Sequence, residues 1–173
     1  ILLSDRREHL KYLYETLKSL NEELEVGFYV GGMKQKLLDN TANKSQIILS
    51  TFSMAAEALD IPKLNCLILA SPKVNVEQAV GRILRKKHSI NPLVIDIEDK
   101  FSIFPNQYKK RLRFYKSNKY NIEDININYN MSNKEIHSLL ININIEDTNK
   151  INKTNKTKNT KQKIITECII DDE

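Results

Sequence analysis

Short apolar runs alternate with amphipathic stretches along roughly the first hundred residues of the chain. The leucines between residues 10 and 20 recur at helical spacing, which predicts an amphipathic helix there. The apolar runs show no polar alternation, so each is expected to be a strand buried on both faces. The predicted strands are Ile1–Leu3, Val26–Val30, Ile47–Leu49, Cys66–Leu69 and Leu93–Ile97. Strands that alternate with helices in this way predict an α/β fold with a parallel sheet covered on both faces.

Composition divides the chain into three parts. Residues 1–120 carry the alternating pattern and are expected to form one domain. Residues 121–146 are rich in Asn and Ile and predict a small α/β extension, with a strand at Ile122–Tyr129 and a short helix that Ser132 could cap. Residues 147–173 are predicted to be a partly disordered tail, because residues 147–163 are of low complexity and nearly free of apolar side chains.

Residues 78–85 read Gln-Ala-Val-Gly-Arg-Ile-Leu-Arg and carry the strongest chemical signal. On a helix, Arg82 and Arg85 leave the same face, because they are three residues apart. Gly81 has no side chain there, so a phosphate or another backbone could come close, and Gln78 lies one turn back. Two guanidinium forks on one face suit a polyphosphate. The alternative is a surface helix with two solvated arginines.

Residues 50–62 read Ser-Thr-Phe-Ser-Met-Ala-Ala-Glu-Ala-Leu-Asp-Ile-Pro and follow a predicted strand. Thr51 stands at the end of that strand, where open α/β sheets place their ligand sites. A short helix is predicted over Met54–Leu59, and Pro62 ends it.

Together these stretches resemble the second, carboxy-terminal lobe of superfamily 2 helicases, a RecA-like fold. Residues 78–85 resemble motif VI, residues 50–62 motif V, Ser-Asp-Arg-Arg-Glu-His-Leu at residues 4–10 motif IV, and Val-Gly-Gly-Met at residues 30–33 is typical of the family. The resemblance implies a catalytic role for Arg85 as the arginine finger, with Arg82 and Gln78 beside it. It implies nucleotide contacts from Asp60, Gly81, Arg82 and Arg85. It implies nucleic-acid contacts from Thr51, Ser4, Arg6, Gly31 and Gly32.

The family uses ATP with Mg²⁺, the metal being held mainly by a first lobe that this sequence does not include. Gly27 and Gly32 have the spacing of a phosphate loop, but Met33 and Lys34 follow where Lys and Ser or Thr are required. Asp96 and Asp99 are interpreted as capping or salt-bridged ends of a strand. The chain is therefore expected to be one lobe of a longer protein, with an amino-terminal RecA-like lobe as its partner. The fragment alone is expected to be inactive.

Three functions stay open at this stage: a helicase on DNA, with RNA as the alternative, a duplex translocase of the same superfamily, and a non-catalytic nucleic-acid-binding lobe. Ala58 favours the last, because the family has glycine there. The run from Asp96 to Phe104, followed by Gln107, Arg111 and Tyr115, resembles helicases of large DNA viruses.

Charge and cysteine content fit an intracellular, soluble protein. The Asn-rich composition indicates a genome rich in A and T, which fits a virus or a parasite. The formal net charge is +5, a moderate excess suited to a few phosphate contacts. Cys66 and Cys168 are the two cysteines, and neither a disulfide nor a metal site is expected. No apolar stretch predicts a membrane span. The helix expected at residues 101–118 has a basic side that is either solvated or in contact with nucleic acid.

Overall fold

The computed structural model describes residues 1–57, 61–84, 92–128, 130–136, 138 and 163–170. The described strands form one seven-stranded sheet in the order β2-β3-β1-β4-β5-β7-β6. Every neighbouring pair is parallel, which confirms the predicted parallel α/β fold. The strands are β1 Leu2–Ser4, β2 Val26–Tyr29, β3 Ile47–Thr51, β4 Cys66–Leu69, β5 Leu93–Glu98, β6 Asn121–Asn128 and β7 Lys163–Ile170.

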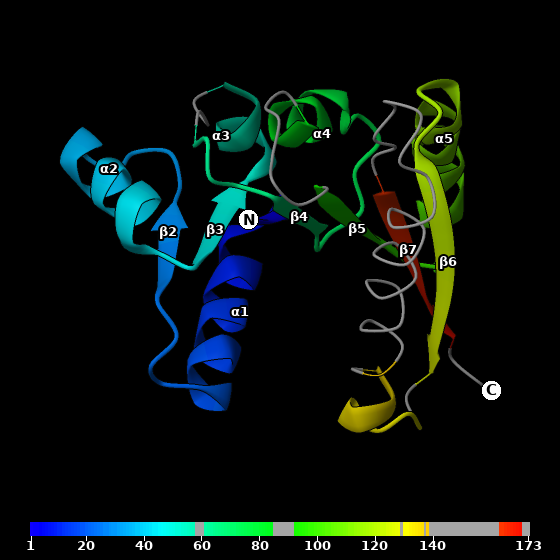
Figure 1. The fold of residues 1–173 in the computed structure, drawn as a ribbon, viewed down its shortest axis with the longest axis horizontal. Coiled ribbons are helices and arrows are strands. Elements are labelled where there is room, and N and C mark those ends of the chain that lie inside the picture. Colours follow the sequence, from blue (N-terminus) through cyan, green and yellow to red (C-terminus); the bar gives the residue numbers. More distant parts are fainter. Residues whose placement is uncertain (58–60, 85–91, 129, 137, 139–162, 171–173) are drawn as a thin grey trace, which may run out of the picture.

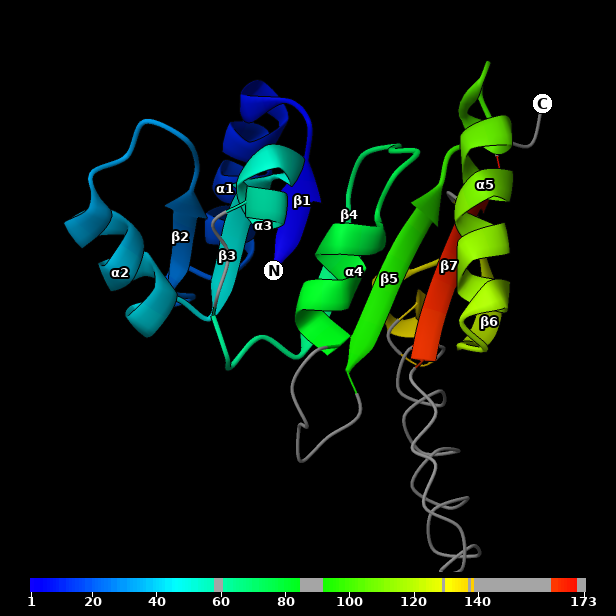
Figure 2. The same cartoon turned by 90° about the horizontal axis from the view of Figure 1, so that it is seen from above.

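Helices cover both faces of this sheet, as Figures 1 and 2 show. The helices are α1 Arg7–Leu20, α2 Gln35–Lys44, α3 Phe52–Glu57, α4 Glu77–Leu84 and α5 Phe104–Ser117. Leu10, Leu13 and Leu17 of α1 pack on one face, together with Leu49 of β3 and Phe28 of β2, whereas Leu20 at the end of the helix is exposed. Helices α2 to α5 pack on the other face, where Leu3, Ile48 and Val80 are almost completely buried. Successive strand residues point to opposite faces, so unbroken apolar runs supply both layers of the core.

Helix α3 begins at Phe52, two residues before the predicted start at Met54. The reason is local: the Oγ1 atom of Thr51 accepts a hydrogen bond from the Met54 backbone N–H at 3.4 Å, so Thr51 caps the helix directly at the end of β3. Leu59, the predicted last residue, lies outside the described residues.

The region after α5 continues the same sheet. Strand β6 covers most of the predicted strand, and the serine cap at Ser132 is confirmed. Its Oγ accepts from the Glu135 backbone N–H at 3.3 Å, while a Glu135 carboxylate oxygen accepts from the Ser132 backbone N–H at 2.7 Å. This reciprocal pair is a capping box.

The carboxy-terminal segment differs in part from its sequence-based prediction. Lys163–Ile170, which we assigned to a disordered tail, forms β7 between β5 and β6. Its sequence, Lys-Ile-Ile-Thr-Glu-Cys-Ile-Ile, is rich in β-branched residues, and it satisfies the backbone groups of both neighbouring strands. Residues 147–162 and 171–173 lie outside the described residues.

Candidate nucleotide and nucleic-acid sites

A pocket of about 860 Å³ lies where β1, β3 and β4 end, and we call it the strand-end pocket. Parallel strands bring their carboxyl ends to one edge, which is where open α/β sheets bind ligands. The polar residues that line it are Asp5, Arg7, Thr51, Ser53, Lys73, Asn75, Glu77 and Gln78. Thr51 and Gly31, both expected to contact nucleic acid, are brought together here.

Arg7 holds the loop after β2 against this pocket. Its Nη2 atom donates to the Gly31 carbonyl at 2.6 Å, and a Cβ atom on Gly31 would lie 3.5 Å from that guanidinium. Gly32 follows with a φ of +84°, a left-handed conformation that favours glycine. Gly32 therefore makes the turn, and Gly31 with Arg7 forms the pocket wall.

Arg7, and not its neighbour Arg6, lines the strand-end pocket. Contact of Arg6 with nucleic acid stays a prediction. Arg6 is exposed, is the N-cap residue of α1 and does not line the strand-end pocket. The sequence signal for Arg7 was its place in the same motif, and the start of the helix decides which of the two exposed arginines borders the pocket.

Ser4 is completely buried, so it has no exposed atom for nucleic acid in this structure. Its Oγ lies 2.9 Å from His9 Nδ1 and accepts from the Arg6 backbone N–H at 3.3 Å. Ser4 therefore stabilises the turn between β1 and α1 and does not cap the helix, whose N-cap residue is Arg6, without a side-chain cap bond.

Lys73 crosses the strand-end pocket and was missed by sequence reasoning. Its ammonium lies 2.9 Å and 3.2 Å from the two carboxylate oxygens of Asp5 and 5.4 Å from the centre of the Phe52 ring. Both side chains of the ion pair are more than a third exposed, so the pair is open to exchange with a solvent anion. A single lysine in a loop has no periodic pattern that could have identified it.

A second pocket of about 350 Å³ lies between α3 and α4, and we call it the α3–α4 pocket. Gln78, Gly81 and Arg82, three of the residues expected at the nucleotide, line it together with Ala56 and Glu77. The Arg82 Nη2 atom donates to the Ala56 carbonyl at 2.8 Å, which ties α4 to α3. Gln78 lines both pockets. Arg85, Asp60 and Ala58 lie outside the described residues.

Gly81 leaves an open space in the α3–α4 pocket. Apart from the adjacent backbone of α4, no atom of the described residues lies within 4 Å of the position where a Cβ atom would stand. Packing among the described residues therefore does not require glycine here. Gly27 is different, because a Cβ atom there would lie 2.7 Å from Thr41 Cγ2 and would also meet the Ser45 hydroxyl. Gly27 is a packing residue of β2 against α2, which agrees with rejecting a phosphate loop.

Behind the strand-end pocket, a buried ion pair joins β5 to α5. The Arg111 Nε atom donates to Asp96 Oδ2 at 2.8 Å, and the Tyr115 hydroxyl donates to the same oxygen at 2.7 Å. This confirms the salt-bridged interpretation of Asp96. Burial raises the pKa of Asp96 above its ordinary value, against the lowering effect of its bonds to Arg111 and Tyr115. Burial and the adjacent Asp96 raise the pKa of Tyr115.

Arg111 also contacts the loop that carries Lys73. Its Nη1 atom donates to the Lys73 backbone carbonyl at 2.7 Å, so the loop that carries Lys73 is fastened to α5. Asp99 accepts from the Phe101 backbone N–H at 2.8 Å and shapes the turn before α5. Within the described residues, no group of three or more His, Cys, Asp or Glu side chains could hold a metal ion. None of the described helices has the length and apolar content to cross a membrane.

Residues 1–87 match the family model of the helicase conserved C-terminal domain. The match covers half of the chain, and the chain therefore belongs to this family, the second lobe of superfamily 2 helicases. No solved structure matches the chain.

Curated relatives come from large DNA viruses, in agreement with the narrower resemblance. A protein of Acanthamoeba polyphaga mimivirus named "Putative ATP-dependent RNA helicase L396" is 42% identical over 139 residues, which cover 78% of this chain and 26% of the relative. Transcript termination protein A18 of Yaba-like disease virus is 30% identical over 121 residues, 65% of this chain and 23% of the relative. The chain thus spans about a quarter of the length of these two relatives.

Proposed function

We propose that this lobe is the second motor lobe of an ATP-dependent nucleic-acid helicase. The α3–α4 pocket faces the nucleotide, and the strand-end pocket carries part of the nucleic-acid track. One observation carries the proposal: Gly81 and Arg82, expected at ATP, line one pocket, and Gly31 and Thr51, expected at nucleic acid, line the other. The two pockets adjoin, because Ala56 of α3 and Glu77 and Gln78 of α4 line both. A helix that borders both pockets can transmit a change at one to the other.

The residues of the α3–α4 pocket fit a polyphosphate. Arg82 presents a planar fork of donors, and Gly81 leaves room for an oxygen-rich group to approach the helix. ATP bound between this lobe and the amino-terminal lobe supplies the free energy of hydrolysis. Arg85 is proposed to stabilise the charge on the transferred phosphoryl group, with Mg²⁺ held mainly by the other lobe.

The strand-end pocket fits a phosphate backbone. Arg7 and Lys73 bring positive charge to it, and Thr51 and Ser53 bring hydroxyl groups that lie 3.1 Å apart. Such groups fix the register of a strand without reading its sequence. The name of the mimivirus relative favours RNA as the substrate, whereas DNA was the first expectation from sequence.

The experiment that tests the proposal measures ATP hydrolysis by the full-length protein with and without single-stranded RNA or DNA. We expect hydrolysis that nucleic acid stimulates, together with separation of a duplex. Displacement of a third strand without duplex separation would favour the translocase. Nucleic-acid binding without any hydrolysis would leave the non-catalytic lobe as the function.

Replacing Gly81 with alanine tests whether a ligand or the other lobe occupies the space above α4. The lobe itself has room for the methyl group, and alanine favours a helix by about 1 kcal/mol over glycine. We therefore expect an unfolding temperature that is unchanged or higher, but ATP hydrolysis by the full-length protein that falls about tenfold or more, a loss of over 1.4 kcal/mol in transition-state binding. Unchanged hydrolysis would show that nothing approaches this part of α4.

A further inference from the structure

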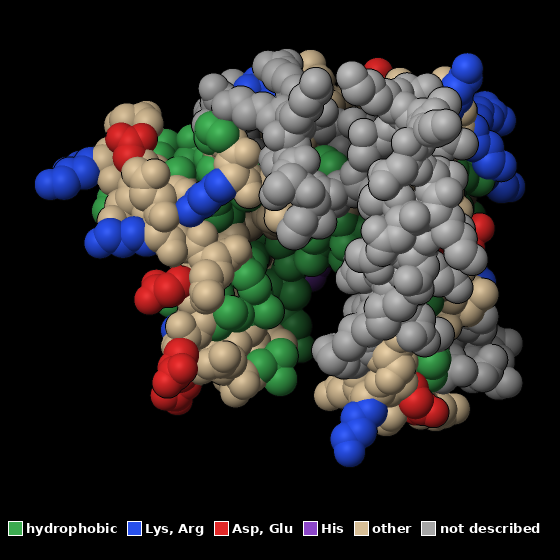
Figure 3. All heavy atoms as spheres, in the orientation of Figure 1, with side chains coloured by type: hydrophobic (Ala, Val, Ile, Leu, Met, Phe, Trp, Pro, Cys, Tyr) green, Lys and Arg blue, Asp and Glu red, His purple; other side chains and the backbone are tan. Residues whose placement is uncertain are grey.

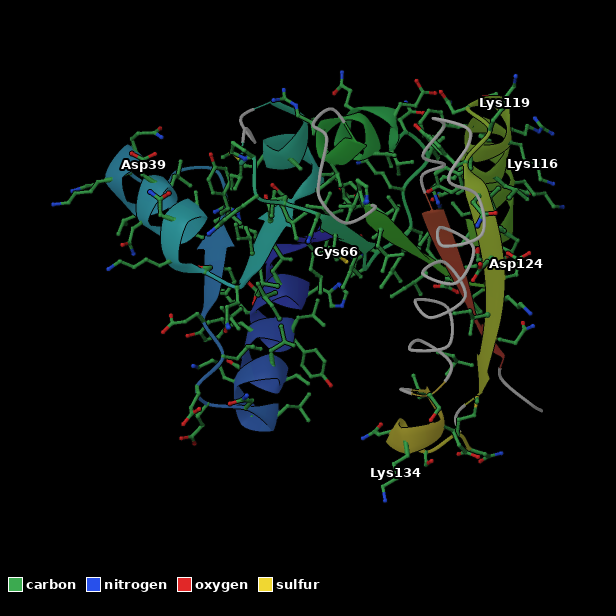
Figure 4. The ribbon with its side chains drawn as sticks, viewed as in Figure 1. Asp39, Cys66, Lys116, Lys119, Asp124 and Lys134 are labelled. Carbon is green, nitrogen blue, oxygen red and sulfur yellow. The ribbon has the colours of Figure 1, made fainter. Side chains whose placement is uncertain are left out.

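A stripe of cations runs along the exposed side of α5. Lys109, Arg113 and Lys116, which we call the basic stripe, lie within about 60° of one another on a helix that turns 100° per residue. All three are exposed, and none forms an ion pair with another residue that the structure describes. Figure 3 shows Lys and Arg side chains gathered over α5, and Figure 4 shows Lys116 pointing outward from it.

Nothing on the helix itself neutralises this stripe. The sequence of α5, Phe-Pro-Asn-Gln-Tyr-Lys-Lys-Arg-Leu-Arg-Phe-Tyr-Lys-Ser, contains no acidic residue, and Lys110 adds a further exposed charge. On the adjacent strand, Asp124 of β6 lies 3.5 Å from the Tyr108 hydroxyl, on the packed side of the helix. Three to four unneutralised cations on a short helix make a local positive potential that attracts polyanions.

The opposite side of α5 is rigidly anchored. Tyr108, Arg111 and Tyr115 are buried, and the last two meet on the carboxylate of Asp96. Such an anchor fixes the rotation of the helix about its axis. The basic stripe therefore has a defined direction, unlike lysines on a flexible tail.

The helix that carries the stripe also contacts the loop that forms one wall of the strand-end pocket. Arg111, which lies between Lys109 and Arg113 in the sequence, donates to the carbonyl of Lys73, and Lys73 lines the pocket. One helix thus fastens a wall of the pocket with its inner side and exposes cations on its outer side. Lys109 and Lys116 are seven residues apart, or about 10 Å, which matches about three phosphates at 3.4 Å per nucleotide along one strand of a duplex.

We propose that the basic stripe binds the phosphate backbone of nucleic acid that continues beyond the strand-end pocket. This proposal rests on the proposed function, because the stripe would extend the nucleic-acid-binding surface that begins at the strand-end pocket. The contacts are to phosphate, so they add affinity for any sequence and do not discriminate between bases. The stripe adds a nucleic-acid contact outside the matched family region, which ends at residue 87.

The test compares two triple variants of the full-length protein. The first carries Lys109→Gln, Arg113→Gln and Lys116→Gln. The control carries Lys34→Gln, Lys36→Gln and Lys44→Gln, which removes the same charge from exposed sites at α2, at the opposite end of the sheet. In Figure 4, Asp39 marks α2 and Lys116 marks α5. Thermal unfolding of both variants establishes that they fold.

Binding of a fluorescent single strand is measured as a function of salt concentration. Loss of three phosphate contacts is expected to lower the slope of log K against log salt by about 2, at about 0.7 per contact. We expect this change in the α5 variant with a strand of about 20 nucleotides, and a smaller one with a strand of about 6 that fills only the pocket. The control should keep the wild-type slope.

Three results overturn the proposal: an unchanged slope in the α5 variant, an equal change in both variants, or an equal change with the short and the long strand. An unchanged slope in the α5 variant would mean that the basic stripe binds an acidic protein surface or is simply solvated. Failure of the proposed function is distinguishable, because it appears as absent ATP hydrolysis in the wild type while the binding difference between the variants persists.

Discussion

Replacing Arg82 with alanine in the full-length protein is expected to lower the turnover number for ATP hydrolysis by about 10²–10³-fold, the usual cost of removing one donor that stabilises transition-state charge. Arg82 lines the α3–α4 pocket beside Gly81, on a helix whose partner α3 begins at the end of a central strand. The guanidinium group can donate two parallel hydrogen bonds to phosphate oxygens in a fixed geometry. Water molecules that fill the space in the variant cannot hold that geometry.

Arg82 also has a structural bond, and the experiment must separate the two roles. Loss of the hydrogen bond to the Ala56 carbonyl alone should cost about 1–3 kcal/mol of local stability, because the acceptor is partly buried. Arg82→Lys keeps the charge but not the fork, so we expect it to recover only a small part of the turnover. Lys44→Ala, which removes an exposed cation far from both pockets, serves as the control and should hydrolyse ATP at the wild-type rate.

The measurement is steady-state hydrolysis with saturating nucleic acid, together with thermal unfolding. A fall in turnover that persists at temperatures well below the lowered unfolding transition assigns Arg82 to the reaction. A wild-type turnover in Arg82→Ala would contradict the nucleotide assignment of the α3–α4 pocket. For Arg85→Ala the expected fall is about 10³–10⁵-fold, with nucleic-acid binding largely intact, and this expectation rests on sequence alone.

The elements that sequence predicted well are those with unbroken apolar runs. Ile47–Thr51 and Cys66–Leu69 are buried or partly buried along their whole length, and such strands are recognised as continuous apolar runs. Strand β7 was missed because a short apolar segment beside a low-complexity stretch gains stability only from long-range pairing with β5 and β6. Local composition does not contain that information.

In the candidate site, too, the residues identified from local sequence differ from those whose role depends on contacts between distant parts of the chain. Gln78, Gly81 and Arg82 were found because they occupy fixed positions of one helix, and helical spacing alone brings them to one pocket. The role of Lys73 comes from tertiary contacts with Asp5 and Phe52, which lie far away in the sequence. The choice between Arg6 and Arg7 depended on the first residue of α1, and helix boundaries are the least predictable feature of a sequence.

Replacing Arg111 with leucine is expected to destabilise the lobe by about 3–5 kcal/mol, because it leaves the carboxylate of Asp96 buried without its cation. Both side chains are almost completely inaccessible, at 2% and 1% exposure, so water cannot replace the guanidinium. One oxygen of Asp96 already has no hydrogen-bond partner among the described residues. In the variant, the Tyr115 hydroxyl would be the one donor left to the other oxygen among those residues.

The cost should depend on pH in a defined direction. Burial already raises the pKa of Asp96 above its ordinary 3.8, and losing the positive charge of Arg111 raises it further. A group whose pKa is higher in the folded state stabilises folding below its unfolded pKa and loses that contribution as pH rises through the folded value. The penalty of Arg111→Leu is therefore expected to be smallest near pH 4 and to grow toward neutral pH.

Hydrogen exchange of peptides from β5 and α5 in the full-length protein measures this local stability without requiring the lobe to fold alone. Asp96→Leu combined with Arg111→Leu should recover most of the loss, since replacing a buried pair by apolar side chains is often neutral or stabilising. The recovered variant still lacks the bond to the Lys73 carbonyl, so its nucleic-acid affinity should stay below that of the wild type. A penalty that is independent of pH and is not relieved in the double variant would mean that packing, and not the charge on Asp96, makes Arg111 necessary.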